Sequence, residues 1–383
     1  MTRTLLRRLA PPAPRPRAAG RVTVVVVPTA PGRRDRTRRA AVAVVTGIAT
    51  VLAAQIALGL AVRTEVSPLR DPLYFDKFAL LRTHPAFFAA ADRPTTVLLV
   101  GSSRTLNAVN ARRAADNLTA HVGRPVEVFN FGQAGAGPVT NAVYFRRLAD
   151  AGVKADFALI EVHPVFLAGQ HPLTPEARWL LPTRLRPDEL PVVRGMGFPA
   201  ATPATHGPRG MLASVYEHRF LLLDRYAPWM LMDNRRLNGG HEPDAFGFCR
   251  PPDVCSPKER AGLTHLTFAQ YAEYFPGYRP TGCGVAAVRD TLEQCRARGI
   301  RPALILMPEC GGWETWYDAE GLKQLDALLA NLSAEFGAPL IDARRWVTAD
   351  ETMDGHHLTG RGADRFTDVL TRDALAPWLG GTR

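Results

Sequence analysis

The chain has few cysteines, and none of them shows the spacing of a zinc site. Only five occur in 383 residues, at positions 249, 255, 283, 295 and 310. The absence of any C-x-x-C pair excludes the common cysteine-ligated zinc motifs. Cys249 and Cys255 flank a turn-prone Arg-Pro-Pro-Asp-Val loop, which would close as a small disulfide ring in an oxidising compartment. The odd number leaves at least one thiol unpaired, and for it we expect a buried apolar position.

Net charge is nearly absent outside the N-terminal segment. The whole chain carries +11, but residues 1–39 hold eleven arginines against Asp35 alone and so account for +10. The remaining 344 residues are close to neutral, and we expect no nucleic-acid partner. The same segment is rich in proline and alanine, which cannot bury enough apolar surface to become ordered. Residues 1–39 are therefore predicted to be a disordered basic tail.

A single long run lacks charge altogether. Residues 40–62 form 23 uncharged positions, and about 20 such residues span a bilayer as a helix. We predict a transmembrane helix that anchors the protein in the lipid bilayer, followed by a connector over 63–94. A buried core helix and a cleaved signal peptide are the alternatives, although a signal's apolar region is shorter, about 7–15 residues. Five arginines directly before the run predict a cytoplasmic N-terminus and an extracytoplasmic domain on a single-pass cell-membrane protein.

The rest of the chain alternates strand-like and helix-like patterns. Short apolar runs predict strands at 95–101, 126–131, 157–162, 302–307 and 338–342. Amphipathic patterns predict helices at 141–152, 284–299, 320–337 and 363–379. This alternation favours a parallel sheet in an α/β sandwich.

About 140 residues separate the third strand from the fourth, which is too many for a simple crossover. We interpret residues 165–280 as an insertion, with a helix over 211–227, that caps the carboxyl edge of the sheet. Ligands bind at that edge in open α/β folds.

Three polar motifs belong at this edge. Val-Gly-Ser-Ser-Arg-Thr (100–105) ends the first strand, a glycine-rich turn (130–137) follows the second, and Asp354-Gly-His-His357 precedes the last helix. Each motif alone also has a non-catalytic interpretation. Gly-Ser and Asp-x-x-His are typical of turns and helix caps. Asp354, His356 and His357 would be an incomplete metal site, and the glycine spacing does not fit a dinucleotide fingerprint.

Together the three motifs resemble the SGNH, or GDSL-type, hydrolase superfamily over about residues 95–377. The resemblance implies a three-layer α/β/α sandwich with a five-stranded parallel sheet, flavodoxin-like in outline, over 95–383. It implies Ser103 as nucleophile, His357 as base and Asp354 as its carboxylate, with the backbone N–H groups of Ser103 and Gly135 as oxyanion donors. It implies an acyl-ester substrate, with cell-envelope carbohydrate esters among the candidates, and neither a cofactor nor a metal.

Those residue types suit the chemistry. A serine hydroxyl becomes a nucleophile when an imidazole takes its proton, and a carboxylate on the other ring nitrogen orients the imidazole. The G-x-S-x-G elbow of α/β-hydrolases is absent from the region around Ser103.

The sequence departs from the superfamily pattern at two places. Ser102 stands where the first block usually has Asp, and Glu161-Val-His-Pro164 replaces the Gly-x-Asn-Asp of the third block. Losing an oxyanion donor such as that Asn typically costs about 10²–10³ in rate. His163 and Asn130 are candidate substitutes, and Arg104 and Glu309 are candidate auxiliary or substrate contacts. The sequence thus predicts a membrane-anchored serine esterase or acyltransferase, or else an inactive envelope-binding or assembly domain of the same fold.

Overall fold

The structure is a computed structural model that describes residues 32–63, 70–89, 91–199, 212–232, 236, 242–310 and 312–381. Most of the predicted tail over 1–39 lies outside these residues, as do 64–69 and 90 of the predicted connector. Within the predicted insertion, residues 200–211, 233–235 and 237–241 also lie outside them.

The helix α1 contains the predicted membrane span. It runs from Arg33 to Arg63, so its first turns include the arginines that precede the uncharged run. Its most apolar window has a mean hydropathy of 2.2 and is not buried within the protein. In the part of the chain that the structure describes, this is the one helix long and apolar enough to cross a membrane, judged by length and composition.

The sheet confirms the fold class expected from the sequence. All its strands are parallel and lie in the order β2-β1-β3-β4-β5. Their bounds are Thr95–Val100, Val126–Asn130, Phe157–Glu161, Arg301–Leu306 and Leu340–Asp342 for β1 to β5. Each lies within a predicted run or starts one residue before it. The alternation of strands with crossover helices explains why every pair is parallel.

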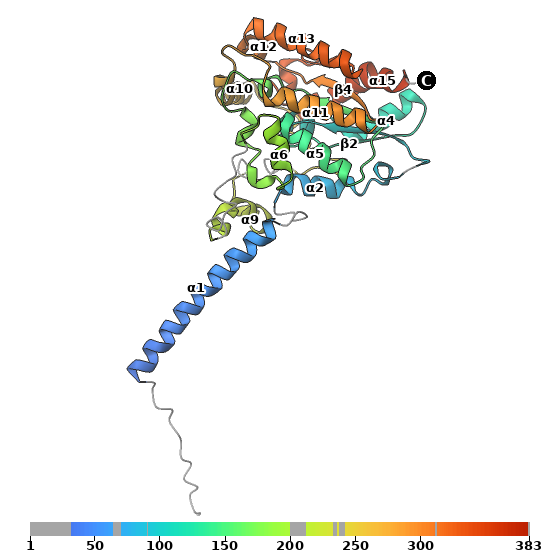
Figure 1. Cartoon of the computed structure of the whole chain (residues 1–383). Coiled ribbons are helices and arrows are strands. Elements are labelled where there is room, and N and C mark those ends of the chain that lie inside the picture. Colours follow the sequence, from blue (N-terminus) through green and yellow to red (C-terminus); the bar gives the residue numbers. More distant parts are fainter. Residues whose placement is uncertain are drawn as a thin grey trace, which may run out of the picture. The chain divides into compact units, whose positions relative to one another are not determined.

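Helices cover both faces of the sheet, which gives the three layers (Figure 1). Successive strand residues point to opposite faces, so Leu98 and Val100 of β1 enter one core while Val97 and Leu99 enter the other. The first core is covered by α5 (Pro138–Asp150), α11 (Cys283–Ala297) and α13 (Ala319–Phe336). The second is covered by α4 (Ala111–Val122), α14 (Gly360–Leu370) and α15 (Ala376–Gly380).

Several helices differ from the sequence prediction. The pattern missed α3 (Ser103–Ala108) and α4. The helix α3 has only six residues and buries the polar Arg104 and Thr105, and the buried face of α4 consists mostly of alanine rather than large apolar side chains. The last predicted helix is interrupted by a π-helical turn between α14 and α15, and the Thr359 side chain caps the start of α14. The helix predicted over 211–227 is instead two short ones, α8 (Ser214–Glu217) and α9 (Arg219–Tyr226).

The insertion reaches the carboxyl edge of the sheet through a buried carboxylate. Glu176 accepts hydrogen bonds from the backbone N–H groups of Gly137, Val139 and Thr140, at the N-terminus of α5. A carboxylate at this end of a helix is also favoured by the helix dipole. The insertion further contains α6 (Glu189–Gly195) and α10 (Pro257–Tyr271). Its bounds at 165–280 and its role as a cap stay predictions.

The expected disulfide ring does not form. Cys249 is buried, and the sulfur of Cys255 lies 3.7 Å from the carbonyl oxygen of Met353 instead of near Cys249. The bend predicted between the two cysteines exists, but it directs their side chains to different neighbours.

The connector is fastened to the domain by a buried ionic cluster around Asp71, at the start of α2 (Pro72–Leu81). Its carboxylate accepts hydrogen bonds from Tyr144 at 2.9 and 2.8 Å, from Arg147 at 2.9 Å and from Arg184 at 3.1 Å. Burial raises the pKa of Asp71, but the two guanidinium groups outweigh it and hold that pKa below its usual value. Asp71 therefore ties the segment after α1 to α5 and to the insertion.

We expect Asp71→Asn to destabilise the domain by about 3–5 kcal/mol, because two buried guanidinium groups would lose their shared anion. The measurement is denaturant unfolding of the detergent-solubilised full chain, followed by tryptophan fluorescence. The matched control is Asp76→Asn, which breaks an ion pair with Arg225 whose side chains are both 43% exposed and should cost at most about 1 kcal/mol. Equal effects of the two variants would contradict this account of the connector.

Candidate active site

The first strand ends in a turn that presents Ser103. A Cβ on Gly101 would lie 2.1 Å from the Thr105 hydroxyl, so a side chain does not fit there. Ser102 is the N-cap of α3, and its hydroxyl accepts a hydrogen bond from the N–H of Arg104 at 3.1 Å. Ser103 is consequently the first residue of α3, directly at the carboxyl edge of the sheet.

Three of the predicted residues lie in one hydrogen-bonded chain. Ser103 Oγ is 2.8 Å from His357 Nε2, and His357 Nδ1 is 2.7 Å from Asp354 Oδ2. Since an ionised carboxylate only accepts, Nδ1 carries the hydrogen and Nε2 is left to accept from the serine. The fold thus brings together a hydroxyl and an imidazole that are 254 residues apart in the sequence.

Asp354 is held in its ionised form. Its other oxygen accepts hydrogen bonds from the backbone N–H groups of His356 at 3.1 Å and His357 at 2.7 Å. Burial raises the pKa of Asp354. The neighbouring imidazoles and these hydrogen bonds have the larger, opposite effect, so the net pKa lies below its usual range. Thr267, on α10 of the insertion, adds a hydrogen bond at 3.3 Å.

The buried carboxylate of Glu161 organises the first turn of α3. It accepts hydrogen bonds from the Ser102 N–H at 2.7 Å, the Ser102 hydroxyl at 2.8 Å and the Thr105 hydroxyl at 2.6 Å. Glu161 is the last residue of β3, the neighbour of β1 in the sheet. An acid from the third block therefore stands beside the position where the first block lacks one.

Arg104 continues this cluster inward and does not face a substrate. Its guanidinium is 3.8 Å from Glu161 and donates to Glu309 at 3.1 Å and to the carbonyl oxygen of Met307 at 2.7 Å. Only 1% of its side chain is exposed, against 4% for Glu309. The interpretation of Arg104 as a substrate contact is therefore wrong, and the Glu309 carboxylate is ion-paired rather than solvated.

The glycine-rich loop lies against the end of β1. The N–H of Gln133 donates to the carbonyl oxygen of Gly101 at 3.0 Å. Gly135 has a positive φ of 71°, and a Cβ there would approach Trp179 of the insertion to 2.6 Å, so glycine is required on both grounds. Among the described residues, none accepts a hydrogen bond from the backbone N–H of Ser103 or of Gly135. Both groups remain open to an oxyanion.

Asn130 is not a substitute oxyanion donor. Both hydrogens of its amide are donated to backbone carbonyls, of Thr105 and Val109, each at 2.8 Å. Its oxygen accepts from the N–H of Gly132 at 2.9 Å. Asn130 is fully buried and holds the loop against α3, so the sequence interpretation is corrected here.

His163, predicted as a candidate substitute for the missing Asn, keeps its hydrogen-bonding capacity. It is 3% exposed, and neither ring nitrogen has a partner in the described part of the chain. Its ring contacts Phe166 at 4.8 Å and His356 at 5.6 Å between centroids. Burial, helped by the charges of Arg104 and the neighbouring histidines, lowers the pKa of His163 well below its usual value. A neutral imidazole retains one N–H donor, as an amide does.

Some residues around the triad carried no signal in the sequence. The ring of His356 stacks on Trp313, with centroids 4.5 Å apart. Trp179, Thr267 and Tyr271 come from the insertion, where neither periodicity nor spacing marked them. Only their position after folding identifies them.

The three side chains of the alternative metal site also lie close together. Asp354, His356 and His357 each offer one ligand atom, and these atoms lie within 4.8 Å of one another. His357, however, uses one ring nitrogen for Asp354 and the other for Ser103. A metal bound through His357 would break one of these two hydrogen bonds, so the observed donor arrangement favours the triad.

No protein-family model matches the sequence, and no curated protein matches it. The solved structures to which the chain is similar include the following three. A GDSL-like lipase from Bacteroides thetaiotaomicron is 10% identical, over 79% of this chain and 98% of its own, with a TM-score of 0.35. A carbohydrate acetylesterase family member from Sinorhizobium meliloti is 13% identical, over 75% and 99%, with a TM-score of 0.31. A lipase/acylhydrolase from Enterococcus faecalis is 12% identical, over 73% and 94%, with a TM-score of 0.30.

We expect His163→Phe to lower kcat for a small acetyl ester by about 10²–10³, the effect of losing one oxyanion donor. The same change should make the domain less sensitive to acid. Because the pKa of His163 is lowered by folding, the unfolded chain takes up a proton that the folded chain refuses as the pH falls below about 6.5.

This uptake costs up to about 1.4 kcal/mol of stability per pH unit, and phenylalanine removes that loss. The measurements are steady-state kinetics and urea unfolding between pH 4.5 and 7.5. If the variant keeps its rate while losing the acid sensitivity, His163 only fills space.

Proposed function

We propose that the protein is a serine esterase or acyltransferase that works through a Ser103 acyl-enzyme. The hydrogen-bonded chain from Ser103 through His357 to Asp354 carries this proposal. It has the polarity that nucleophilic acyl transfer requires, from hydroxyl to imidazole to carboxylate. The similar solved structures are too low in sequence identity to support this proposal.

In the proposed reaction, Ser103 Oγ attacks the ester carbonyl while His357 Nε2 takes the hydroxyl proton. The backbone N–H groups of Ser103 and Gly135 donate to the oxyanion, and His163 is the third donor. His357 then returns the proton to the leaving alcohol, and the ionised Asp354 stabilises the imidazolium throughout. Water completes a hydrolysis, and the hydroxyl of a second substrate completes an acyl transfer.

The proposal extends to the location and to the substrate class. The length and composition of α1 and the arginines before the uncharged run support a single-pass membrane anchor with the domain outside the cytoplasm. Acyl esters that occur there, including O-acylated carbohydrates of the envelope, are the proposed substrates.

A second candidate function follows from Glu161-Val-His-Pro164. Because this segment lacks the Asn of the third block, the domain could bind an envelope ligand without catalysis. The labelling experiment below distinguishes the two functions.

Ser103→Ala should abolish covalent labelling by a fluorophosphonate and reduce esterase turnover to background. His357→Ala should have nearly the same effect, because nucleophile and base act as a unit. Gel fluorescence of the labelled full chain and hydrolysis of p-nitrophenyl acetate are the measurements.

The matched control is Ser102→Ala, one residue away. Its hydroxyl is bonded to Glu161 and to the N–H of Arg104, so we expect only a modest loss of rate and continued labelling. If the Ser103→Ala protein is labelled at the parent rate, or if the parent is not labelled, the catalytic proposal is rejected and the binding function is favoured.

The orientation has its own test. A reporter enzyme that is active only outside the cytoplasm should be active when fused after residue 383, because the arginine asymmetry retains the N-terminus inside. The same reporter placed before residue 40 should be inactive. The opposite pair of results would show that the orientation is reversed.

A further inference from the structure

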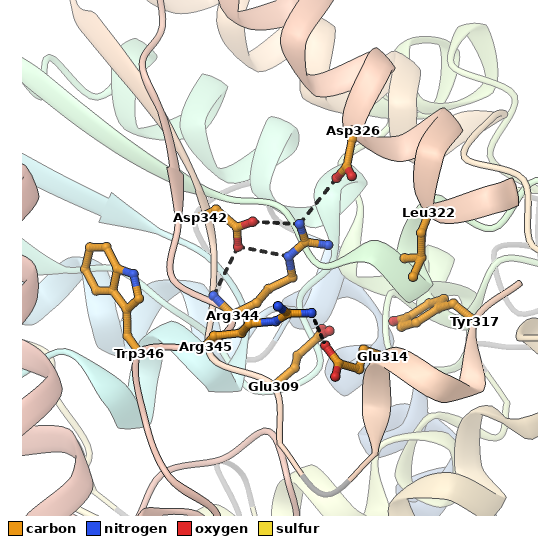
Figure 2. A pocket seen from close by; sticks show the side chains of 9 residues that line it. All are labelled: Glu309, Glu314, Tyr317, Leu322, Asp326, Asp342, Arg344, Arg345 and Trp346. Carbon is orange, nitrogen blue, oxygen red and sulfur yellow. Dashed lines mark hydrogen bonds and ion pairs between the residues drawn. The ribbon is translucent and has the colours of Figure 1, made fainter. Parts of the chain in front are cut away.

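A cavity separate from the triad opens at the carboxyl ends of β4 and β5. Its volume is about 540 Å³, within the range of small-molecule sites. Its walls come from the loop after β4, the start of α13 and the segment after β5 (Figure 2). The side chains that matter for recognition are Glu309, Tyr317, Leu322, Asp342, Arg344 and Trp346.

A buried hydroxyl in this cavity lacks a partner. Tyr317 is 5% exposed, and in the described part of the chain nothing hydrogen-bonds to its phenolic oxygen. Figure 2 shows that oxygen directed into the cavity, toward the carboxylate of Glu309. Burial and the charge of Glu309 raise the pKa of Tyr317 well above its usual value, so the hydroxyl keeps its proton. An unmade hydrogen bond of this kind costs about 1–3 kcal/mol, which a ligand atom can recover.

Two carboxylates fix the guanidinium of Arg344, and one of its nitrogens, Nη1, has no acceptor among the described residues. Its Nε and Nη2 donate to the Asp342 carboxylate at 2.9 and 2.6 Å, and Nη2 also contacts Asp326 at 3.3 Å. None of the described residues accepts from Nη1, which faces the cavity in Figure 2. Two carboxylates thus orient the guanidinium and leave that donor group for a ligand.

The charges of the lining select the ligand class. Four acidic side chains line the cavity against Arg344 and Arg345, and Arg104 behind the lining pairs with Glu309, so one negative charge is in excess and disfavours phosphate and carboxylate ligands. The remaining pattern is a mixture of donors and acceptors, flanked by the apolar surfaces of Leu322 and Trp346. Hydroxyl groups both donate and accept, and the C–H face of a ring can pack on an indole.

We propose that this cavity binds an uncharged, hydroxyl-rich ring, that is, a neutral sugar unit. Tyr317 and Arg344 would donate to its hydroxyl oxygens, Glu309 would accept from a hydroxyl, and Trp346 would cover one face.

The cavity is coupled to the proposed catalytic serine. Glu309 is ion-paired with Arg104, the residue after Ser103. The end of β1 is separated from the ends of β4 and β5 by two to three strand spacings, or roughly 10–15 Å at about 4.8 Å each. A sugar held here therefore places a neighbouring unit of the same glycan toward Ser103. This second step rests on the proposed function, whereas binding of the sugar does not.

The experiment measures binding to the detergent-solubilised full chain by saturation-transfer NMR and by calorimetry. The probes are glucose and N-acetylglucosamine, with glucose 6-phosphate and glucuronate as anionic counterparts. Tyr317→Phe removes only the hydroxyl and should weaken binding of the neutral sugars about tenfold. Leu322→Trp, which fills the cavity, should abolish it. Tyr216→Phe, at a 66% exposed tyrosine outside the cavity, should leave binding unchanged.

Saturable binding of a neutral sugar that Tyr317→Phe and Leu322→Trp weaken supports the proposal. Absence of such binding, tighter binding of the anionic sugars, or equal binding by all three variants overturns it. An O-acetylated sugar then tests the link to catalysis, since Leu322→Trp should raise its KM more than that of p-nitrophenyl acetate. Because binding is measured without turnover, failure of the esterase function would leave the binding result readable.

Discussion

The structure around the nucleophile depends on one buried ionic cluster, Glu161–Arg104–Glu309. It joins the end of β3, the first turn of α3 and the loop after β4. In a dry environment each of these charges is stable only with the others, and removing one typically costs about 3–5 kcal/mol. Such a cluster admits few alternative geometries. It therefore fixes the helix turn that carries Ser103 more firmly than apolar packing of a six-residue helix would.

Much of the fold was predictable because it rests on local patterns. The apolar runs are strands, and parallel strands necessarily share their carboxyl edge, which is why the motifs with Ser103 and His357 come together. The features that could not be predicted depend on contacts made only in the folded chain. The buried face of α4 is mostly alanine and contains no run of large apolar residues, and the amide of Asn130 donates to carbonyls that approach it only in the folded chain. Trp179 and Thr267 lie in an insertion whose course no local pattern encodes.

The two places where the sequence departs from the pattern it resembles are in direct contact. In the sequence, Ser102 and Glu161 are 59 residues apart and look like independent losses. In the structure they are hydrogen-bonded partners at 2.8 Å. The carboxylate of Glu161 thus places a negative charge beside Ser102, where the resemblance implies an Asp. Spacing within a single sequence cannot reveal such a compensation, because it is expressed only across neighbouring strands.

The junction after α1 limits how far the domain can lie from that helix. Arg70 donates through Nε to the carbonyl oxygen of Val62 at 3.1 Å, and the next residue is the buried Asp71. Even fully extended, the seven steps from Arg63 to Arg70 cover at most about 25 Å. For the proposed membrane-anchored esterase, so short a connection would keep the catalytic serine near the bilayer surface. The proposed substrates would then be polymers that come within this distance of the membrane, rather than esters scattered through the envelope.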